Sequence, residues 1–282
     1  MNLRDALSAA TETLRAAGVS SPEHDAKALA VHVLGLRKPS ELALHDTIDD
    51  DVYGGLVARR ASRVPLQHLT GSVGFRWIEL EVGPGVFVPR PETESVVQWA
   101  IDNITRVNPL VVDLCAGSGT IAFALANEVP GATVHAVERD PVALEWTKRN
   151  AARLAAAGDP PVQLHLGSVV DCLPELDGTV DLVASNPPYV AEDERQLPEP
   201  EVVDHDPEIA LFAGTDGLDV IRLVEQAARR LLKPGGLVVV EHSDRQGRSA
   251  PAVFEQAGGW TEVEDHQDLT GRDRFVTARW AR

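Results

Sequence analysis

The segment S-N-P-P-Y, residues 185–189, contains the residues whose types and spacing are best suited to chemistry. It follows the apolar run 180–185, which is typical of a buried strand. Two prolines stiffen the backbone and remove donors, so the carbonyl of Pro187 can accept a hydrogen bond, and Asn186 offers a side-chain oxygen as a second acceptor. The ring of Tyr189 provides a face for stacking. Together these groups suit a planar substrate that carries an NH2 group.

A glycine-rich segment, D-L-C-A-G-S-G at residues 113–119, lies earlier in the chain. Gly117 and Gly119 would let the backbone approach a ligand closely, with the N-terminus of a following helix facing it. The next strand ends at Glu138, where an acid can accept hydrogen bonds from both hydroxyls of a ribose. Ser168 follows the third strand, where a loop would flank an adenine ring. These features predict an adenosine-bearing cofactor, but they do not distinguish nicotinamide from other cofactors, because the glycines also fit G-x-G-x-x-A.

The elements that must position these residues alternate between strand and helix from about residue 91 onward. Such alternation requires crossover helices and therefore predicts an α/β fold with a mostly parallel sheet. Ligands bind outside the carboxyl ends of such strands, where both motifs fall. Strands are expected at 110–114, 133–138, 162–166, 180–185, 237–241, 261–265 and 274–279. Helices are expected at 120–127, 141–157 and about 218–232, and K-P-G-G at 233–236 is expected to form a turn.

Residues 1–72 predict a small helical domain, with apolar residues at helical spacing near 3–14, 22–34 and 50–63. It contains no catalytic constellation of its own, so we expect it to dock a substrate or to be structural. Residues 73–90 alternate around G-P-G and predict a β-hairpin linker with its turn at 83–85. Residues 91–282 would then form the main domain.

The composition limits the partners. Acidic residues outnumber basic ones, 43 against 26, and the formal net charge is −17. A nucleic-acid-binding protein needs a basic face, so direct binding to DNA or RNA is disfavoured. Neither the nine histidines nor the two cysteines show metal-ligand spacing, and no metal is expected. The absence of a long apolar run and of a signal-peptide pattern predicts a cytoplasmic protein with no membrane partner.

At these motifs the chain resembles the class I S-adenosylmethionine-dependent methyltransferases. More narrowly, it resembles the protein-(glutamine-N5) methyltransferases that modify the Gly-Gly-Gln motif of class 1 peptide-chain release factors in translation termination. N-P-P-Y alone is shared with DNA amino-methyltransferases, but its combination with the other segments is specific. The segments are P-L-Q-H-L-T-G (65–71), F-V-P-R-P-E-T-E (87–94), D-L-C-A-G-S-G (113–119), S-N-P-P-Y (185–189), E-P-E-V-V-D-H-D-P-E-I-A-L-F-A-G-T-D-G-L-D (199–219) and G-R-D-R (271–274).

The resemblance implies a Rossmann-like methyltransferase domain preceded by the helical domain and the linker, with S-adenosyl-L-methionine as cofactor and a release factor as partner. We expect a monomer. Catalytic roles are implied for Asn186, Pro187 and Tyr189. The implied cofactor-binding residues are Asp113, Cys115, Ala116, Gly117, Ser118, Gly119, Glu138, Ser168, Val169 and Asn186. The implied substrate-binding residues are Pro89, Arg90, Glu92, Asn186, Pro187, Pro188 and Tyr189.

Some residues depart from the family pattern, and other functions stay open. Relatives often have D-L-G-T-G-S-G, so Cys115 and Ala116 are substitutions that we expect to be tolerated because both glycines remain. Val169 stands where many relatives carry a side chain that packs the adenine, and His242 has no assigned role. Other candidate substrates are a ribosomal-protein glutamine and an exocyclic amino group of a nucleic-acid base, which the acidic charge disfavours. A cofactor-dependent binding module and a dehydrogenase are less favoured.

Overall fold

The computed structural model describes residues 1–196 and 199–282, which form two compact units. The first unit consists of Met1–Ser72 together with residues 199–205. The second consists of residues 73–196 and Asp206–Arg282. The segment 199–205 therefore packs with the N-terminal helices, although residues 73–196 and 206–282 belong to the second unit.

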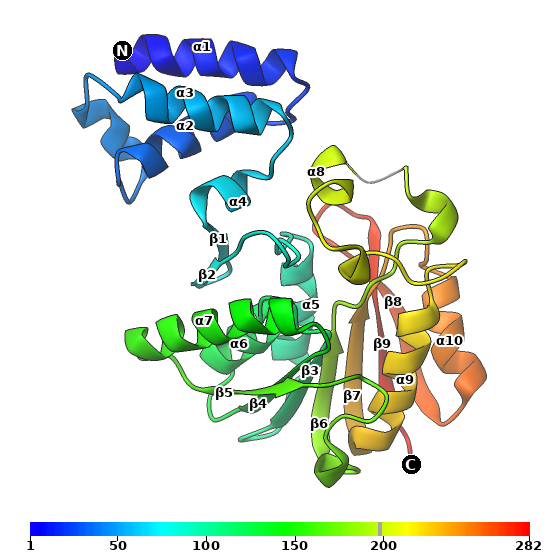
Figure 1. Ribbon diagram of the computed structural model, residues 1–282. Coiled ribbons are helices and arrows are strands. Elements are labelled where there is room, and N and C mark those ends of the chain that lie inside the picture. Colours follow the sequence, from blue (N-terminus) through cyan, green and yellow to red (C-terminus); the bar gives the residue numbers. More distant parts are fainter. Residues whose placement is uncertain (197–198) are drawn as a thin grey trace. The chain divides into compact units, whose positions relative to one another are not determined.

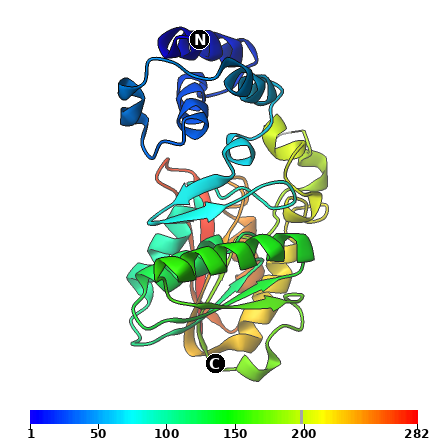
Figure 2. The same ribbon diagram turned by 60° about the vertical axis from the view of Figure 1, so that its left-hand side comes forward.

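The first unit is helical, as predicted. Its elements are α1 (Leu3–Ala16), α2 (Pro22–Val33), η1 (Pro39–Leu44), α3 (Asp50–Ala61), α4 (Leu66–Thr70) and α8 (Pro200–Val203). Helices α1, α2 and α3 pack together (Figure 2). Their apolar faces share a core that contains Leu14, Leu29 and Tyr53. Asn2 and Asp49 cap the N-termini of α1 and α3 by accepting hydrogen bonds from backbone N–H groups.

A buried cluster of charges ties α8 to this unit. Glu201 lies 138 residues after Arg63, whose Nε donates to its Oε1 at 2.8 Å. Nη2 of Arg60 lies 2.8 Å from the same oxygen, and Nε of Arg60 donates to Asp25 at 2.7 Å. Asp25, Arg60 and Glu201 are all buried. A buried charge is tolerated when it is paired and hydrogen-bonded, so these side chains depend on one another.

Strands β1 (Ser72–Phe75) and β2 (Ile78–Glu81) form a two-stranded sheet. Its turn contains Arg76, which has a positive φ of 49°. The hairpin turn is therefore at 76–77 and not at the predicted 83–85. The chain does turn at G-P-G, where the N–H of Val86 donates to the carbonyl of Gly83 at 3.4 Å, but this turn follows the second strand. Gly83 also allows close packing, because an added Cβ would lie 2.6 Å from the ring of Trp146.

The second unit contains a seven-stranded sheet in the order β5-β4-β3-β6-β7-β9-β8 (Figure 1). The strands are β3 (Leu110–Leu114), β4 (Thr133–Glu138), β5 (Val162–Leu166), β6 (Val180–Ser185), β7 (Leu232–Glu241), β8 (Trp260–Gln267) and β9 (Asp273–Trp280). β9 is antiparallel to both of its neighbours and the other pairs are parallel. The predicted mostly parallel α/β sheet is confirmed. The strand order reverses at β3 and β6, and ligands bind at such a point.

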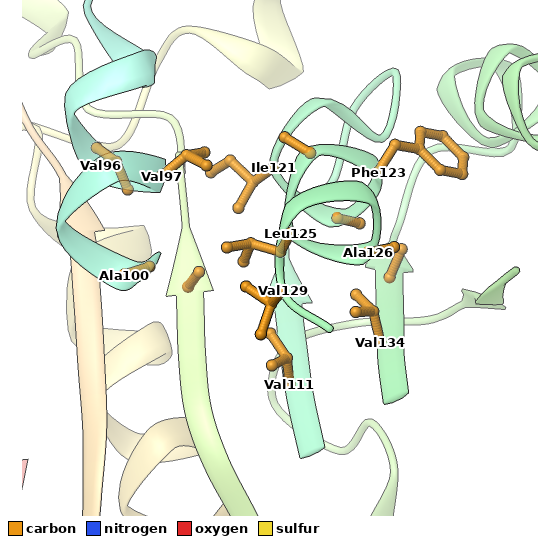
Figure 3. Close-up of a cluster of buried hydrophobic side chains, with 14 of the residues drawn as sticks. Val96, Val97, Ala100, Val111, Ile121, Phe123, Leu125, Ala126, Val129 and Val134 are labelled. Atoms are coloured by element: carbon orange, nitrogen blue, oxygen red, sulfur yellow. The ribbon is translucent and has the colours of Figure 1, made fainter. Parts of the chain in front are cut away.

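Helices cover both faces of this sheet. The helices of the second unit are α5 (Thr93–Asn103), α6 (Thr120–Glu128), α7 (Pro141–Ala157), α9 (Asp219–Leu231) and α10 (Ser249–Ala257), with short η2 (Pro174–Leu176), η3 (Glu192–Glu194) and η4 (Glu208–Ala210). Successive side chains of a strand point to opposite faces. Accordingly, Val111 packs with α5 and α6, whereas Val112 packs with α9 and α10. Figure 3 shows the first interface, where Leu125 and Val129 lie over Val111.

The K-P-G-G segment does not leave the sheet as the predicted turn would. Val180 pairs with Leu232 and Leu182 pairs with Leu237, so four residues, 233–236, lie opposite a single residue of β6. Gly235 has a positive φ of 80°, which lets the strand bulge here and rejoin its partner.

Candidate functional site

The glycine loop joins the carboxyl end of β3 to α6. Gly117 and Gly119 have positive φ values of 57° and 88°, and so does Cys115, at 61°. A Cβ at Gly119 would lie 2.2 Å from the ring of Phe123, whereas a Cβ at Gly117 would meet nothing within 4 Å. Packing therefore requires Gly119, while Gly117 faces open space that a ligand can fill.

Two buried side chains of α7 hold this loop from behind. Thr147 Oγ1 donates to the carbonyl of Gly117 at 2.7 Å, and Asn150 Nδ2 donates to the carbonyl of Ser118 at 3.0 Å. Both side chains are fully buried. The loop is thus held in one conformation before any ligand arrives, which reduces the entropy lost on binding.

Two buried acids lie at this loop. Glu138 accepts backbone N–H bonds from Gly117 and Asp140, both at 2.8 Å, and an ionised carboxylate can accept about two more. Asp113 accepts from the N–H of Ala122 at 3.0 Å, while its Oδ1 is buried without a partner among the described residues. Burial, reinforced by Glu138, raises the pKa of Asp113. A buried acceptor without a donor fits a ligand that carries donors.

The remaining predicted cofactor residues have different surroundings. Ser168 is exposed, and its Oγ accepts from the N–H of Val170. The side chain of Val169 is buried in a hydrophobic cluster that also contains Leu114 and Val137, and its contact with a cofactor stays a prediction. Ala116 is buried, and its N–H donates to Val137. Burial raises the pKa of the Cys115 thiol, which therefore stays protonated at neutral pH.

The N-P-P-Y loop begins beside the glycine loop. Ser185 Oγ donates to the carbonyl of Leu114 at 2.6 Å, which joins the carboxyl ends of β6 and β3. Asn186 Nδ2 donates to Oγ1 of Thr93 at 3.2 Å. Pro187 is buried, while Asn186 and Pro188 are half-buried. Since its nitrogen is bound by Thr93, the oxygen of Asn186 is the atom left to accept a hydrogen bond from a substrate.

Tyr189 contacts the buried carboxyl group of Glu241, which the sequence did not indicate. The Tyr189 hydroxyl donates to Oε1 of Glu241 at 3.2 Å. Burial and the neighbouring Glu241 raise the pKa of Tyr189, so the phenol stays protonated. Burial also raises the pKa of Glu241 to about 7. Glu241 ends β7, the strand beside β6, so the rule that points to Asn186 could also have pointed to it.

The segment after N-P-P-Y is supported by the D-P-E-I-A-L-F-A-G-T-D-G-L-D run. Val190 donates to Leu211 at 2.8 Å and accepts from Ala213 at 3.0 Å, both through the backbone. Gly217, with φ of 70°, packs so closely that an added Cβ would lie 2.3 Å from the carbonyl of Tyr189. This run therefore fixes the exit of the loop.

The predicted substrate-binding residues in P-R-P-E-T-E are partly buried or paired with other side chains. Pro89 is buried, and Arg90 Nη2 pairs with the buried Asp206 at 3.1 Å. Burial raises the pKa of Asp206 to about 6, although Arg90 acts in the opposite direction. Glu92 is half-buried and lies near enough to Glu241 to raise its pKa. Contacts of these residues with a substrate stay predictions.

The structure gives His242 a structural explanation. Its ring is fully buried, with Nε2 2.8 Å from Oδ1 of Asp265 on β8 and Nδ1 2.8 Å from the carbonyl of Ser243. Burial lowers the pKa of His242. The side chain thus joins the end of β7 to β8 across the intervening β9.

Within residues 1–196 and 199–282, no group of three or more His, Cys, Asp or Glu side chains could hold a metal ion. Of the helices that the structure describes, none combines the length and the hydropathy needed to cross a membrane.

Comparisons with known proteins agree with this geometry. The PrmC N-terminal domain family matches residues 5–71, and a methyltransferase domain family matches residues 107–273. The release factor glutamine methyltransferase of Streptomyces coelicolor is 52% identical over 275 residues, which cover 96% of each chain. That of Mycolicibacterium smegmatis is 48% identical and covers 98% of this chain and 97% of the relative.

Solved structures support the fold alone. A methyltransferase from Pyrococcus furiosus superposes with a TM-score of 0.52 at 17% identity, covering 72% of this chain and 89% of that one. The hMettl16 catalytic domain, solved with an RNA hairpin, gives a TM-score of 0.56 at 15% identity, covering 72% and 75%.

Proposed function

Because the chain belongs to the family of release factor glutamine methyltransferases, we propose that it methylates the side-chain amide nitrogen (N5) of the glutamine in the Gly-Gly-Gln motif of class 1 peptide-chain release factors. The enzyme uses S-adenosyl-L-methionine as methyl donor. The observation that carries the proposal is Asn186, whose nitrogen is bound by Thr93 and whose oxygen is free to accept, beside the glycine loop.

The residues around the glycine loop fit this cofactor. S-adenosylmethionine supplies a methyl group that its positively charged sulfur already activates. Glu138 retains acceptor capacity for ribose hydroxyls, the unpartnered oxygen of Asp113 suits a donor group, and Gly117 leaves room for a ligand. The proposed cofactor-binding set is otherwise the one that the resemblance implies.

The protein's task is to orient a poor nucleophile. The lone pair of an amide nitrogen is delocalised into its carbonyl. Acceptance of its two hydrogens by the Asn186 oxygen and the Pro187 carbonyl would favour a more pyramidal nitrogen with its lone pair directed away from both acceptors. The Tyr189 ring would stack on the planar amide. The nitrogen loses a proton after it gains the methyl group, so no strong base is needed.

The partner and location belong to the same proposal. We assign substrate docking to the helical unit of residues 1–72, linkage to residues 73–90 and catalysis to residues 91–282. We propose a monomer that acts in the cytoplasm, where release factors work, without contacting nucleic acid directly. The net charge of −17 supports the last point, because phosphate binding needs a basic face.

The test is transfer of labelled methyl from S-adenosylmethionine to a purified release factor, beside a copy whose Gly-Gly-Gln glutamine is replaced by alanine. Label on the first and not on the second is expected. Label on neither, with cofactor binding confirmed, would contradict the proposed substrate and favour a ribosomal-protein glutamine or a nucleic-acid base.

The role of Asn186 is tested by Asn186→Ala. We expect the turnover number to fall by about 100-fold or more, as when one polar contact to a reacting group is removed. Affinity for S-adenosylhomocysteine should fall much less. Asn103→Ala, at an exposed position of α5, is the matched control. Equal losses of turnover and of cofactor affinity in Asn186→Ala would contradict this division of roles.

A further inference from the structure

Glu241 is a deeply buried acid next to the N-P-P-Y loop, with 1% of its surface exposed. Its Oε1 accepts from the Tyr189 hydroxyl at 3.2 Å, and its Oε2 is buried without a partner among the described residues. The nearby Thr93 hydroxyl favours its ionised form, and so does the guanidinium of Arg274. A buried carboxyl with a free oxygen needs a reason.

The direction of the hydrogen bonds around Glu241 gives a reason for the burial of this carboxyl group. An ionised carboxylate only accepts hydrogen bonds, so a neighbouring hydroxyl can bond to it only as a donor. If Thr93 donates its one hydrogen to Glu241, its oxygen can only accept from Asn186. The nitrogen of Asn186 must then face Thr93, as observed at 3.2 Å, and the amide cannot flip. Tyr189 is oriented by the same carboxylate.

We propose that Glu241 is a positioning residue for methyl transfer: as a carboxylate it fixes the donor direction of Thr93 and Tyr189, and thereby holds the Asn186 oxygen toward the glutamine amide. This rests on the proposed function only for the identity of the substrate. Glu241 touches no reacting atom, and its effect passes through Thr93 and Tyr189.

Protonation would remove this control, because a neutral carboxyl carries a donor of its own and lets Thr93 reverse. With a pKa of about 7, Glu241 is ionised above neutral pH and protonated below it. The other groups facing it are Tyr189 from the loop after β6, Arg274 from β9 and Glu92 at the start of α5. The adjacent His242 is turned to Asp265 on β8. Turnover is therefore expected to rise with pH through a midpoint near 7.

The first test needs no substrate. NMR measures hydrogen exchange of the side-chain NH2 of Asn186 in the full chain at pH 8, with Asn186→Asp used to assign the signal. We expect Glu241→Gln and Thr93→Val to speed this exchange about 10-fold or more, because the amide loses its fixed partner. Thr93→Ser, which keeps the hydroxyl, and Glu255→Gln, exposed on α10, should resemble the wild type. Unchanged exchange in Glu241→Gln would overturn the inference.

The second test compares turnover. Glu241→Gln should lower kcat about 10- to 100-fold, with affinity for S-adenosylhomocysteine within about twofold, and should lose the pH midpoint near 7. A variant that keeps the wild-type kcat and midpoint would overturn the inference. If the wild type itself methylates no release factor, the proposed function fails. The exchange result would still decide the role of Glu241.

Discussion

The two glycines of the cofactor loop should respond differently to the same substitution. Both have positive φ, where an alanine costs about 1–2 kcal/mol relative to glycine. At Gly117 the added methyl meets no atom within 4 Å. At Gly119 it would lie 2.2 Å from the Phe123 ring and 2.9 Å from Thr147, and such overpacking costs about 1–3 kcal/mol more.

The expected free energy of unfolding therefore falls by about 1–2 kcal/mol in Gly117→Ala and by about 2–5 kcal/mol in Gly119→Ala. In a unit of this size, each kcal/mol lowers the melting temperature by about 2–4 °C. Thermal unfolding without cofactor should place Gly119→Ala at least about 2 °C below Gly117→Ala. Equal melting temperatures would refute the packing argument.

Cofactor binding should show the opposite order. The methyl group of Gly117→Ala occupies the space assigned to the cofactor, so calorimetric titration with S-adenosylhomocysteine should show an affinity loss of about 10-fold or more. Gly119→Ala, measured below its melting temperature, should lose less, because its methyl group points toward α6 and α7. Normal affinity in Gly117→Ala would show that the open space beside it is not the cofactor site.

Two further predictions concern charges away from the site. Glu201→Gln should lower the free energy of unfolding by about 3 kcal/mol, because it leaves Arg63 without its buried acid and Arg60 with Asp25 as its only one. The exposed Glu199→Gln should change the free energy of unfolding by less than about 0.5 kcal/mol. Urea unfolding measures both, and equal effects would contradict the buried cluster. Burial acts to raise the pKa of Asp268, but hydrogen bonds from the β8–β9 turn outweigh it and lower the pKa to about 2. Because the pKa of Asp268 is lower in the folded protein than the unfolded value of about 3.9, its ionised carboxylate stabilises the fold above about pH 4. This stabilisation is lost as the pH falls through 2. The difference in the free energy of unfolding between wild type and Asp268→Asn should therefore be largest above about pH 4 and should decrease as the pH falls below it. A difference that does not change with pH would argue against this linkage.

The inner strands β3, β4 and β6 were predictable because they are buried on both faces. Such strands appear in the sequence as short apolar runs, and all three begin and end at the predicted residues. The partly exposed edge strand β5 also begins and ends as predicted. The carboxyl-end rule then identified both motifs of the candidate site. Local patterns thus suffice where burial is continuous.

The errors and omissions come from contacts between distant residues. G-P-G does form a turn, but turn rules consider neighbouring residues only. They could not show that the hairpin closes earlier, at 76–77, or that Gly83 makes room for Trp146. The network of Thr93, Asn186, Tyr189 and Glu241 joins three separate segments. Thr93 belongs to the P-R-P-E-T-E segment, but no local pattern shows that it contacts Asn186 or that Glu241 contacts Tyr189. The pairing of Arg90 with Asp206 is equally invisible without the fold.

The cluster around Glu201 also constrains the order in which the chain matures during synthesis. The ribosome makes the N-terminal helices first, but Glu201 emerges 138 residues after Arg63, which at about 5–20 residues per second is on the order of 10 s later. During this interval Arg63 lacks its acid and Arg60 has only Asp25, so the helical unit cannot reach its full stability. By then β3 to β6 have been made and β7 to β9 have not. The two units therefore cannot fold strictly one after the other, and the nascent chain must complete the first while the second is still unfinished.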